Sequence, residues 1–147
     1  MSLPSQLLNC IACNVIVADS VLQEARTHLE FLGYTVEVSG DWLLVSQPGC
    51  FSWALRDFRG GVLFRKVFPV SEAGRAKREA VLAFANRLNA DASFVRAYVN
   101  EPGDVAIEAW YPNLYERRSF GMFVTQLDGD LRAQLGRCRE EVETLLA

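Results

Sequence analysis

The sequence is poor in the features that mark membrane proteins, secreted proteins and metalloenzymes. Its 147 residues include one histidine and four cysteines, and no apolar run approaches the roughly 20 residues that a membrane-spanning helix needs. The first residues also lack the basic stretch that opens a secretory signal. We therefore expect a cytoplasmic protein that does not associate with a membrane.

The cysteines do not form a recognisable metal or redox site. Cys10 and Cys13 have C-x-x-C spacing, which holds zinc only with a second pair and serves redox chemistry where a helix N-terminus lowers the thiol pKa. Neither companion is evident, and Cys50 and Cys138 stand alone. We interpret all four as small buried hydrophobic residues in a reducing compartment, and we expect no metal and no cofactor.

The charge of the chain argues against nucleic acid as a partner. Its net charge is −3 and its pI is near 5.2, whereas proteins that hold nucleic acid by its phosphates carry basic surfaces. Small basic groups occur at Arg75, Lys77 and Arg78 and again at Arg117 and Arg118. We interpret them as solvated helix faces.

The one histidine does not indicate catalysis. His28 follows Glu24 by four residues on a predicted helix, and no nucleophile in the sequence stands out as its partner. We interpret His28 as a surface or boundary residue and expect a protein without enzymatic activity.

Composition and hydrophobic spacing predict one α+β domain that covers residues 1–147. Half of the residues are hydrophobic and 22% are charged, as in a soluble globular domain. A helix begins at Asp19 as N-cap and ends at Gly33. A hairpin over residues 34–46 turns at Gly40 and Asp41, and extended segments follow at 51–57 and 62–68.

Two more helices are predicted. Ser71 caps one that runs to about Leu88, with an apolar stripe of Val81, Leu82, Ala85 and Leu88. Residues 116–146 carry the longest helical pattern; a continuous helix there would be roughly 46 Å long. It either breaks at residues 128–130, with Asp130 as a new cap, or it overhangs the sheet and packs on another subunit. Residues 3–18 are apolar and fit a strand or a helix equally.

Residues 94–111 predict a β-hairpin that organises the rest of the chain. We prefer a three-residue loop of Glu101, Pro102 and Gly103, with Gly103 in the left-handed region, although Pro102 also suits a shorter type II loop. This register gives one wholly aliphatic face. Its pairs are Val95 with Ala109, Ala97 with Ile107 and Val99 with Val105 on that face, and Phe94 with Trp110, Arg96 with Glu108 and Tyr98 with Ala106 on the other.

Three consecutive segments resemble a known family. Residues 85–89 (ANRLN) lead into residues 94–99 (FVRAYV) and 103–109 (GDVAIEA). A helix that ends in an N-x-x-N-like segment and runs into an aromatic-rich hairpin resembles the YbjN-type family, labelled as bacterial sensory transduction regulators, with the type III secretion chaperone-like fold. The resemblance covers residues 22 to about 135. It implies a non-enzymatic, often dimeric cytoplasmic protein, and the secretion chaperones of the same fold bind extended segments of protein partners.

We therefore expect an antiparallel sheet of five to six strands with helices packed on one face, in the layout α-β-β-β-α-β-β-α. The expected function is a protein-binding module, chaperone-like or regulatory, that captures an extended segment of a protein partner, and we expect a homodimer. A second layer formed by residues 51–68 or the C-terminal helix would instead bury the binding face. The alternative is a small-ligand sensor whose aromatic residues line a pocket between sheet and helices. The expected partner-binding residues are Trp42, Leu44, Phe94, Arg96, Tyr98, Glu108 and Trp110.

Overall fold

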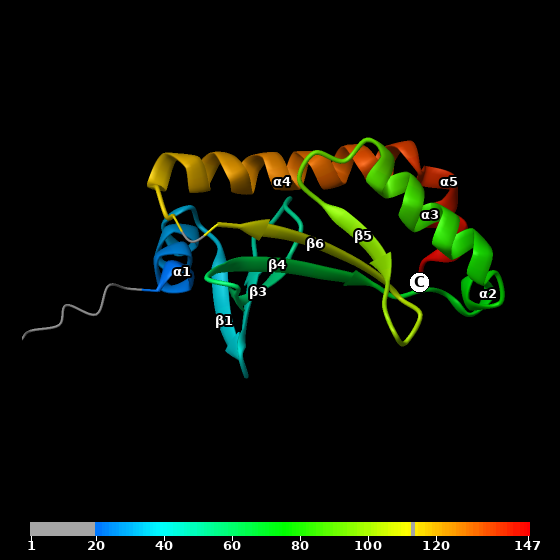
Figure 1. Cartoon of the computed structure of the whole chain (residues 1–147), viewed down its shortest axis with the longest axis horizontal. Coiled ribbons are helices and arrows are strands. Elements are labelled where there is room, and N and C mark those ends of the chain that lie inside the picture. Colours follow the sequence, from blue (N-terminus) through cyan, green and yellow to red (C-terminus); the bar gives the residue numbers. More distant parts are fainter. Residues whose placement is uncertain (1–19, 113) are drawn as a thin grey trace, which may run out of the picture.

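The computed structural model describes residues 20–112 and 114–147. The segment 3–18, the Cys10 and Cys13 pair and the expected cap Asp19 lie outside these residues. Within them, six strands form one antiparallel sheet in the order β1-β2-β3-β4-β6-β5, and the helices pack on one of its faces (Figure 1). The predicted α+β class is confirmed, with four strands ahead of the second helical region and with each later helix divided in two.

The helices are α1 (Val21–Phe31), α2 (Glu72–Arg75), α3 (Arg78–Ala90), α4 (Arg117–Arg137) and α5 (Arg139–Leu145). The strands are β1 (Thr35–Ser39), β2 (Trp42–Ser46), β3 (Trp53–Phe58), β4 (Gly61–Phe68), β5 (Arg96–Val99) and β6 (Val105–Tyr111). None of these helices combines the length and apolar character needed to cross a membrane; this holds for residues 20–112 and 114–147.

The core lies between the helices and what we call the inner face of the sheet. Successive strand residues point to opposite faces, and Val45, Leu55, Phe64 and Ile107 are among the fully buried residues of the inner one. They form one cluster with the apolar sides of the helices. The ring centroids of Phe64 and of Phe120 on α4 lie 6.3 Å apart. Each such side chain stabilises the fold by about 1.5–3 kcal/mol.

Both predicted hairpin registers are confirmed. The first pairs Val36 with Val45 and Val38 with Leu43. The second pairs residues 96–99 with 108–105, and Gly103 has φ 94° as the three-residue loop requires. However, β5 begins only at Arg96, so the expected pairings of Phe94 with Trp110 and of Val95 with Ala109 are not part of the ladder.

The helix predicted from Ser71 to Leu88 is divided. Ser71 is the N-cap as predicted, since its Oγ accepts a hydrogen bond of 3.0 Å from the amide of Gly74. Yet α2 ends after one turn, where Gly74 packs so closely on α5 that a Cβ would clash with the main chain of Leu145. The apolar stripe of α3 includes Phe84 and omits Leu82, which is 44% exposed.

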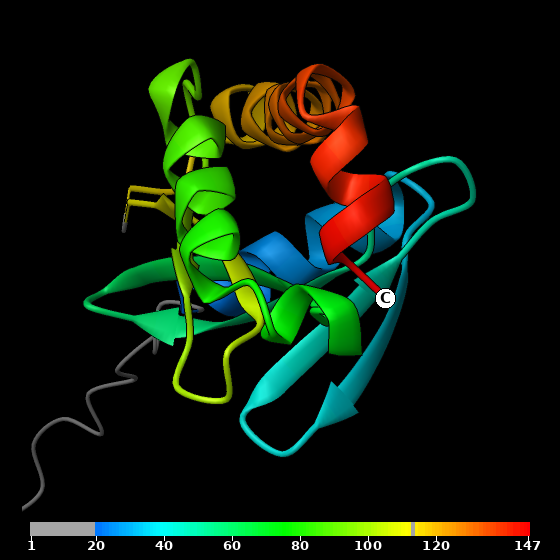
Figure 2. The same cartoon turned by 90° about the vertical axis from the view of Figure 1, so that its right-hand side faces the viewer.

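The C-terminal helix does not break at Gly129. α4 runs continuously to Arg137, and the chain bends at Cys138 before α5. The C-terminal end of this region, α5, packs on its own chain, because the Ser71 amide donates to the carbonyl of Leu145 at 2.8 Å. Helix α5 also lies beside α2 in both views (Figures 1 and 2). A second subunit is therefore not needed to cover the overhang.

Side chains cap the starts of α1 and α4. Ser20 caps α1, with its Oγ 3.2 Å from the amide of Gln23. The carboxylate of Glu116 caps α4 by accepting from the amides of Arg118 at 2.9 Å and Ser119 at 2.7 Å. The hydroxyl of Ser119, followed by these two amides, lowers the pKa of Glu116 to about 2.

Two of the cysteines can be compared with the expectation. Cys138 is buried, as predicted for a small hydrophobic residue, but Cys50 is exposed in the loop before β3. The prediction was therefore wrong for Cys50, because the turn at Gly49, with φ 80°, keeps this segment at the surface.

Candidate functional site

The outer face of the sheet, opposite the helices, carries six of the seven predicted site residues. The strand pairings arrange them in rows across the sheet, and no helix or further strand of residues 20–112 and 114–147 covers this face (Figure 1). Leu44, Tyr98 and Trp110 are 42%, 37% and 46% exposed. The described residues thus contain no second layer there. The middle row runs Glu37, Leu44, Ala54, Arg65, Glu108 and Arg96, each paired with the next.

Glu108 is the centre of a polar network on this face. Its Oε1 accepts from Arg65 Nε at 2.7 Å and Nη2 at 2.5 Å and from the Tyr98 hydroxyl at 2.9 Å. Its Oε2 accepts from Arg96 Nε at 3.2 Å and Nη2 at 2.5 Å. The carboxylate is almost fully buried beneath these groups. It therefore fixes one tyrosine and two arginines rather than offering a free charge.

The same network sets the ionisation of its members. Burial raises the pKa of Glu108, but the hydrogen bonds from Arg96, Arg65 and Tyr98 outweigh it, so the pKa lies below its ordinary value. Burial and the hydrogen bond to Glu108 raise the pKa of Tyr98. At neutral pH the cluster holds an ionised carboxylate, a neutral phenol and two cations.

Trp42 lies under stacked guanidinium groups. The Cζ atoms of Arg56 and Arg65 lie 4.7 and 5.1 Å from the centroid of its ring. Such contacts stabilise a cation over an indole by about 0.5–2 kcal/mol. Trp42 is half-buried as a result, and Arg65 joins it to Glu108 across the sheet.

A cavity of 390 Å³ lies on the outer face, beside Trp110 near the C-terminal end of β6. Its apolar walls are Phe58, Phe94 and Trp110, and Arg59 and Arg96 stand among its other lining residues. The indole Nε1 of Trp110 donates to the carbonyl of Phe58 at 2.9 Å, which fixes the ring beside the opening. Two of the predicted aromatic residues, Phe94 and Trp110, therefore line a pocket, but this pocket lies on the outer face rather than between the sheet and the helices.

Phe94 differs from the other predicted site residues. Its ring centroid lies 5.8 Å from that of Phe123 on α4, so it bridges the sheet edge and the helical layer instead of lying flat on the outer face. Asp130 of α4 holds this segment, because its Oδ2 accepts from the amides of Ser93, Phe94 and Val95 at 3.0, 2.8 and 3.2 Å. One of the two alternatives for the C-terminal helix made Asp130 a helix cap; it instead anchors the approach to β5.

The two edge strands of the sheet, β5 and β1, differ in whether a side chain hydrogen-bonds to their main chain. Along β5, the side chain of Asn89 accepts from the amide of Ala97 at 2.6 Å and donates to its carbonyl at 2.9 Å. No side chain within residues 20–112 and 114–147 hydrogen-bonds in this way to the main chain of β1, where Val38 is 64% exposed. The edge at β1 is the open one.

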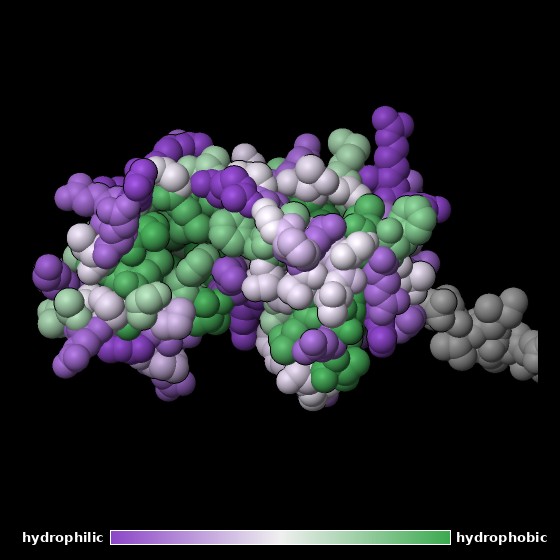
Figure 3. All heavy atoms as spheres, turned by 180° about the vertical axis from the view of Figure 1, so that it is seen from behind, coloured by the Kyte–Doolittle hydropathy of each residue, from purple (hydrophilic) through white to green (hydrophobic). Residues whose placement is uncertain are grey.

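A second apolar surface is visible from behind. Hydrophobic side chains gather in a hollow beneath α4 and α5, at the end of the molecule away from α1 (Figure 3). The hollow is distinct from the outer face, since it lies on the helical side of the sheet.

His28 is buried, which corrects the expectation of a surface or boundary residue. It packs against Phe120, with ring centroids 5.3 Å apart, and its Nδ1 lies 2.9 Å from the hydroxyl of Tyr115. Burial, and after it the charge of Arg117, lowers the pKa of His28. Sequence reasoning missed this site because Tyr115 is 87 positions away.

An antiparallel six-stranded sheet with helices on one face and an uncovered outer face defines the fold class. Among solved structures, the chain is similar to the crystal structure of YbjN from E. coli, described as a candidate transcription regulator, with a TM-score of 0.69 and 16% sequence identity. The match covers 86% of this chain and 95% of that one. At this identity the likeness shows the fold, and it confirms the YbjN-like fold inferred from residues 85–109. No family model matches the sequence, and no curated protein matches it significantly.

Proposed function

We propose that this protein is a non-enzymatic cytoplasmic binding module that captures an extended segment of a protein partner on the outer face of its sheet. The observation that supports the proposal is the 390 Å³ cavity beside Trp110, bounded by aromatic side chains and arginines. Binding hot spots are rich in Trp, Tyr and Arg. Here Glu108 holds Arg96 and Tyr98 in place, and the carbonyl of Phe58 holds Trp110, so little side-chain entropy is lost on binding.

The cavity also indicates the chemistry of the partner. Phe58, Phe94 and Trp110 suit one aromatic or aliphatic anchor side chain. Arg96 has 66% of its side chain exposed, and the one carboxylate among the lining residues, Glu108, is already paired with two arginines. The captured segment should therefore carry an acidic residue beside its apolar anchor. A regulator of the kind named for YbjN is compatible with such a surface.

Selection from a random peptide library tests the proposal. The library is selected on the wild-type protein, and enriched peptides are measured against Trp110→Ala, Arg96→Gln and Leu82→Ala. Leu82 is 44% exposed on α3, close to the 46% of Trp110, but lies away from the outer face. We expect peptides with an apolar residue next to Asp or Glu, and at least tenfold weaker binding to the first two variants only.

Other outcomes would contradict this function. If no selected peptide depends on Trp110 and Arg96, the outer face does not capture such segments. If light scattering shows a dimer that Trp110→Ala dissociates, a second copy of the chain occupies the face instead. Circular dichroism of each variant shows whether the fold is retained, and Arg96→Gln keeps the test valid if Trp110→Ala does not fold.

A further inference from the structure

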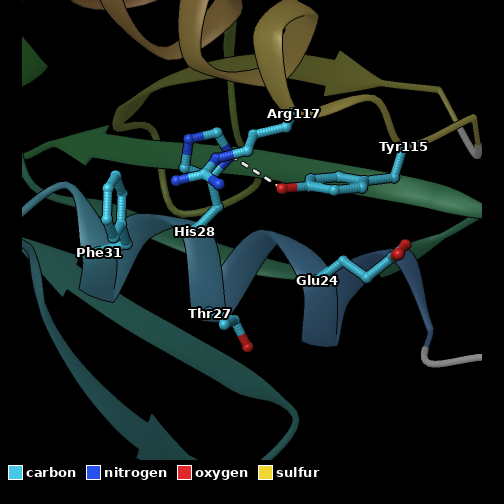
Figure 4. A pocket seen from close by; sticks show the side chains of 6 residues that line it. All are labelled: Glu24, Thr27, His28, Phe31, Tyr115 and Arg117. Atoms are coloured by element: carbon cyan, nitrogen blue, oxygen red, sulfur yellow. Dashed lines mark hydrogen bonds between the residues drawn. The ribbon is translucent and has the colours of Figure 1, made fainter.

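A cavity of 340 Å³ lies on the helical side of the sheet, between α1 and the start of α4 (Figure 4). Helix α1 contributes Glu24, His28 and Phe31, and the chain that leads into and begins α4 contributes Tyr115 and Arg117. None of these residues belongs to the outer face. The cavity therefore has to be explained separately from the proposed capture of a protein segment.

The two charged groups of this cavity lie toward opposite ends. In Figure 4 the guanidinium of Arg117 lies near Phe31 and His28, whereas the carboxylate of Glu24 lies on the side of Tyr115. The Cζ of Arg117 is 4.5 Å from the centroid of the Phe31 ring, a stacking contact that orients the planar group. Among the described residues, neither Arg117 nor Glu24 has an ion-pair partner.

His28 and Tyr115 form a neutral centre between these ends. The 2.9 Å contact between His28 Nδ1 and the Tyr115 hydroxyl holds both rings. Burial, assisted by Arg117, favours the uncharged imidazole. A ligand would thus meet a cation, a neutral hydrogen-bonding pair and an anion in succession along α1.

We propose that this cavity binds a small zwitterion with a carboxylate at one end and an amino group at the other. Arg117 can pair with a carboxylate through two parallel hydrogen bonds, and Glu24 can accept from an ammonium group. Glu24 and Phe31 are seven positions apart, roughly 10 Å along the helix. A dipeptide, at about 3.5 Å per residue plus a hydrogen bond of about 2.9 Å at each end, spans roughly 13 Å, which is enough to reach from one charged group to the other. A ligand with only a negative charge would be repelled by Glu24, and a ligand with only a positive charge would be repelled by Arg117.

The test uses His28, the one histidine of the chain, as a reporter in ¹⁵N NMR of its imidazole. Three probes are titrated: alanylalanine, its N-acetyl derivative, which keeps only the carboxylate, and its C-terminal amide, which keeps only the amine. We expect the zwitterion to bind at least tenfold more tightly than either derivative. Arg117→Gln and Glu24→Gln should each weaken its binding at least tenfold, whereas Arg118→Gln, a neighbour that does not line the cavity, should not.

Two results would overturn the proposal. One is that no probe moves the His28 signals. The other is that the acetylated probe binds as tightly as alanylalanine to both the wild type and Glu24→Gln, which would leave a carboxylate site alone. Trp110→Ala should retain full binding of the zwitterion, so the failure of this site and the failure of the outer face can be told apart.

Discussion

The side chain of Asn89 on α3 forms two hydrogen bonds with the main chain of Ala97 on β5, one to its amide at 2.6 Å and one to its carbonyl at 2.9 Å. An amide side chain has the donor and the acceptor that a neighbouring strand would supply. Asn89 thus closes this edge of the sheet against pairing with another chain. The edge at β1 has no such closure among the described residues.

Replacing Asn89 with alanine should destabilise the protein and open this edge. The amide and the carbonyl of Ala97 would both lose a hydrogen bond, which lowers the free energy of unfolding by about 1–3 kcal/mol for a partly buried site. Urea unfolding measures the loss, and hydrogen exchange should show faster exchange at the Ala97 amide. Asn86→Ala is the matched control, because Asn86 is exposed on the same helix. Equal losses in the two variants would mean that the contact with Ala97 contributes nothing.

Glu108→Gln should be the most damaging polar substitution on the outer face. It leaves Arg65 and Arg96 side by side without their shared carboxylate. We expect a loss of about 3 kcal/mol at pH 7, at the low end for breaking a buried pair, because Arg96 stays in contact with water. Thermal or urea unfolding measures it. Glu37→Gln, at the other end of the same row, should change stability by less than about 0.5 kcal/mol.

The cost of Glu108→Gln should depend on pH. The folded-state pKa of Glu108 lies below its ordinary value, so the unfolded chain takes up the proton first as the pH falls. The stabilising contribution is present above about pH 4.5 and is lost as the pH falls through the folded-state pKa. Unfolding measured from pH 7 to pH 3 should show wild type and variant converging. A constant difference would contradict the ionised network.

Local patterns predicted the fold well where neighbours in sequence are neighbours in space. The registers of the two hairpins followed from turn residues and from the alternation of aliphatic side chains, as at Val36 and Ala97. The points at which the later helices divide, between α2 and α3 and between α4 and α5, did not follow from such local patterns. Gly129 lies in open helix and permits continuity, whereas the close approach of Gly74 to Leu145 joins segments about 70 positions apart. No local signal reports such a contact.

The candidate site was predicted in part for the same reason. Strand parity placed Trp42, Tyr98 and Trp110 on one face. Tyr98 and Trp110 are exposed there, whereas Trp42 is half-buried under the guanidinium groups of Arg56 and Arg65. It could not show that β4 pairs with β6, which brings Arg65 to Glu108. The sequence therefore predicted Glu108 as a surface residue paired with Arg96 alone, whereas its carboxylate is buried and also binds Arg65. The cavity at His28 was missed because it depends on where α4 crosses α1.

Gly129→Ala should stabilise the protein, since α4 is continuous there and an added Cβ would meet nothing within 4 Å. Replacing glycine with alanine inside a helix contributes about 0.5–1 kcal/mol. Gly61→Ala is the opposite case: its Cβ would lie 2.7 Å from Trp110 Nε1 and would clash with the main chain of Tyr111. We expect the free energy of unfolding of that variant to fall by about 1–3 kcal/mol. Destabilisation by Gly129→Ala, measured by urea unfolding, would point to a break in α4.

The imidazole of His28 should titrate below its ordinary pKa of 6.5. Burial is the larger cause and the charge of Arg117 the smaller, so Arg117→Gln should raise the pKa only part of the way toward 6.5, and Arg118→Gln should leave it closer to the wild-type value. Because the unfolded chain takes up this proton first, the free energy of unfolding should fall as the pH drops from 6.5 through the folded-state pKa. NMR titration of the single histidine measures the first effect and urea unfolding the second. A pKa at or above 6.5 would show that His28 is open to water and that the cavity beside Tyr115 lacks its neutral centre.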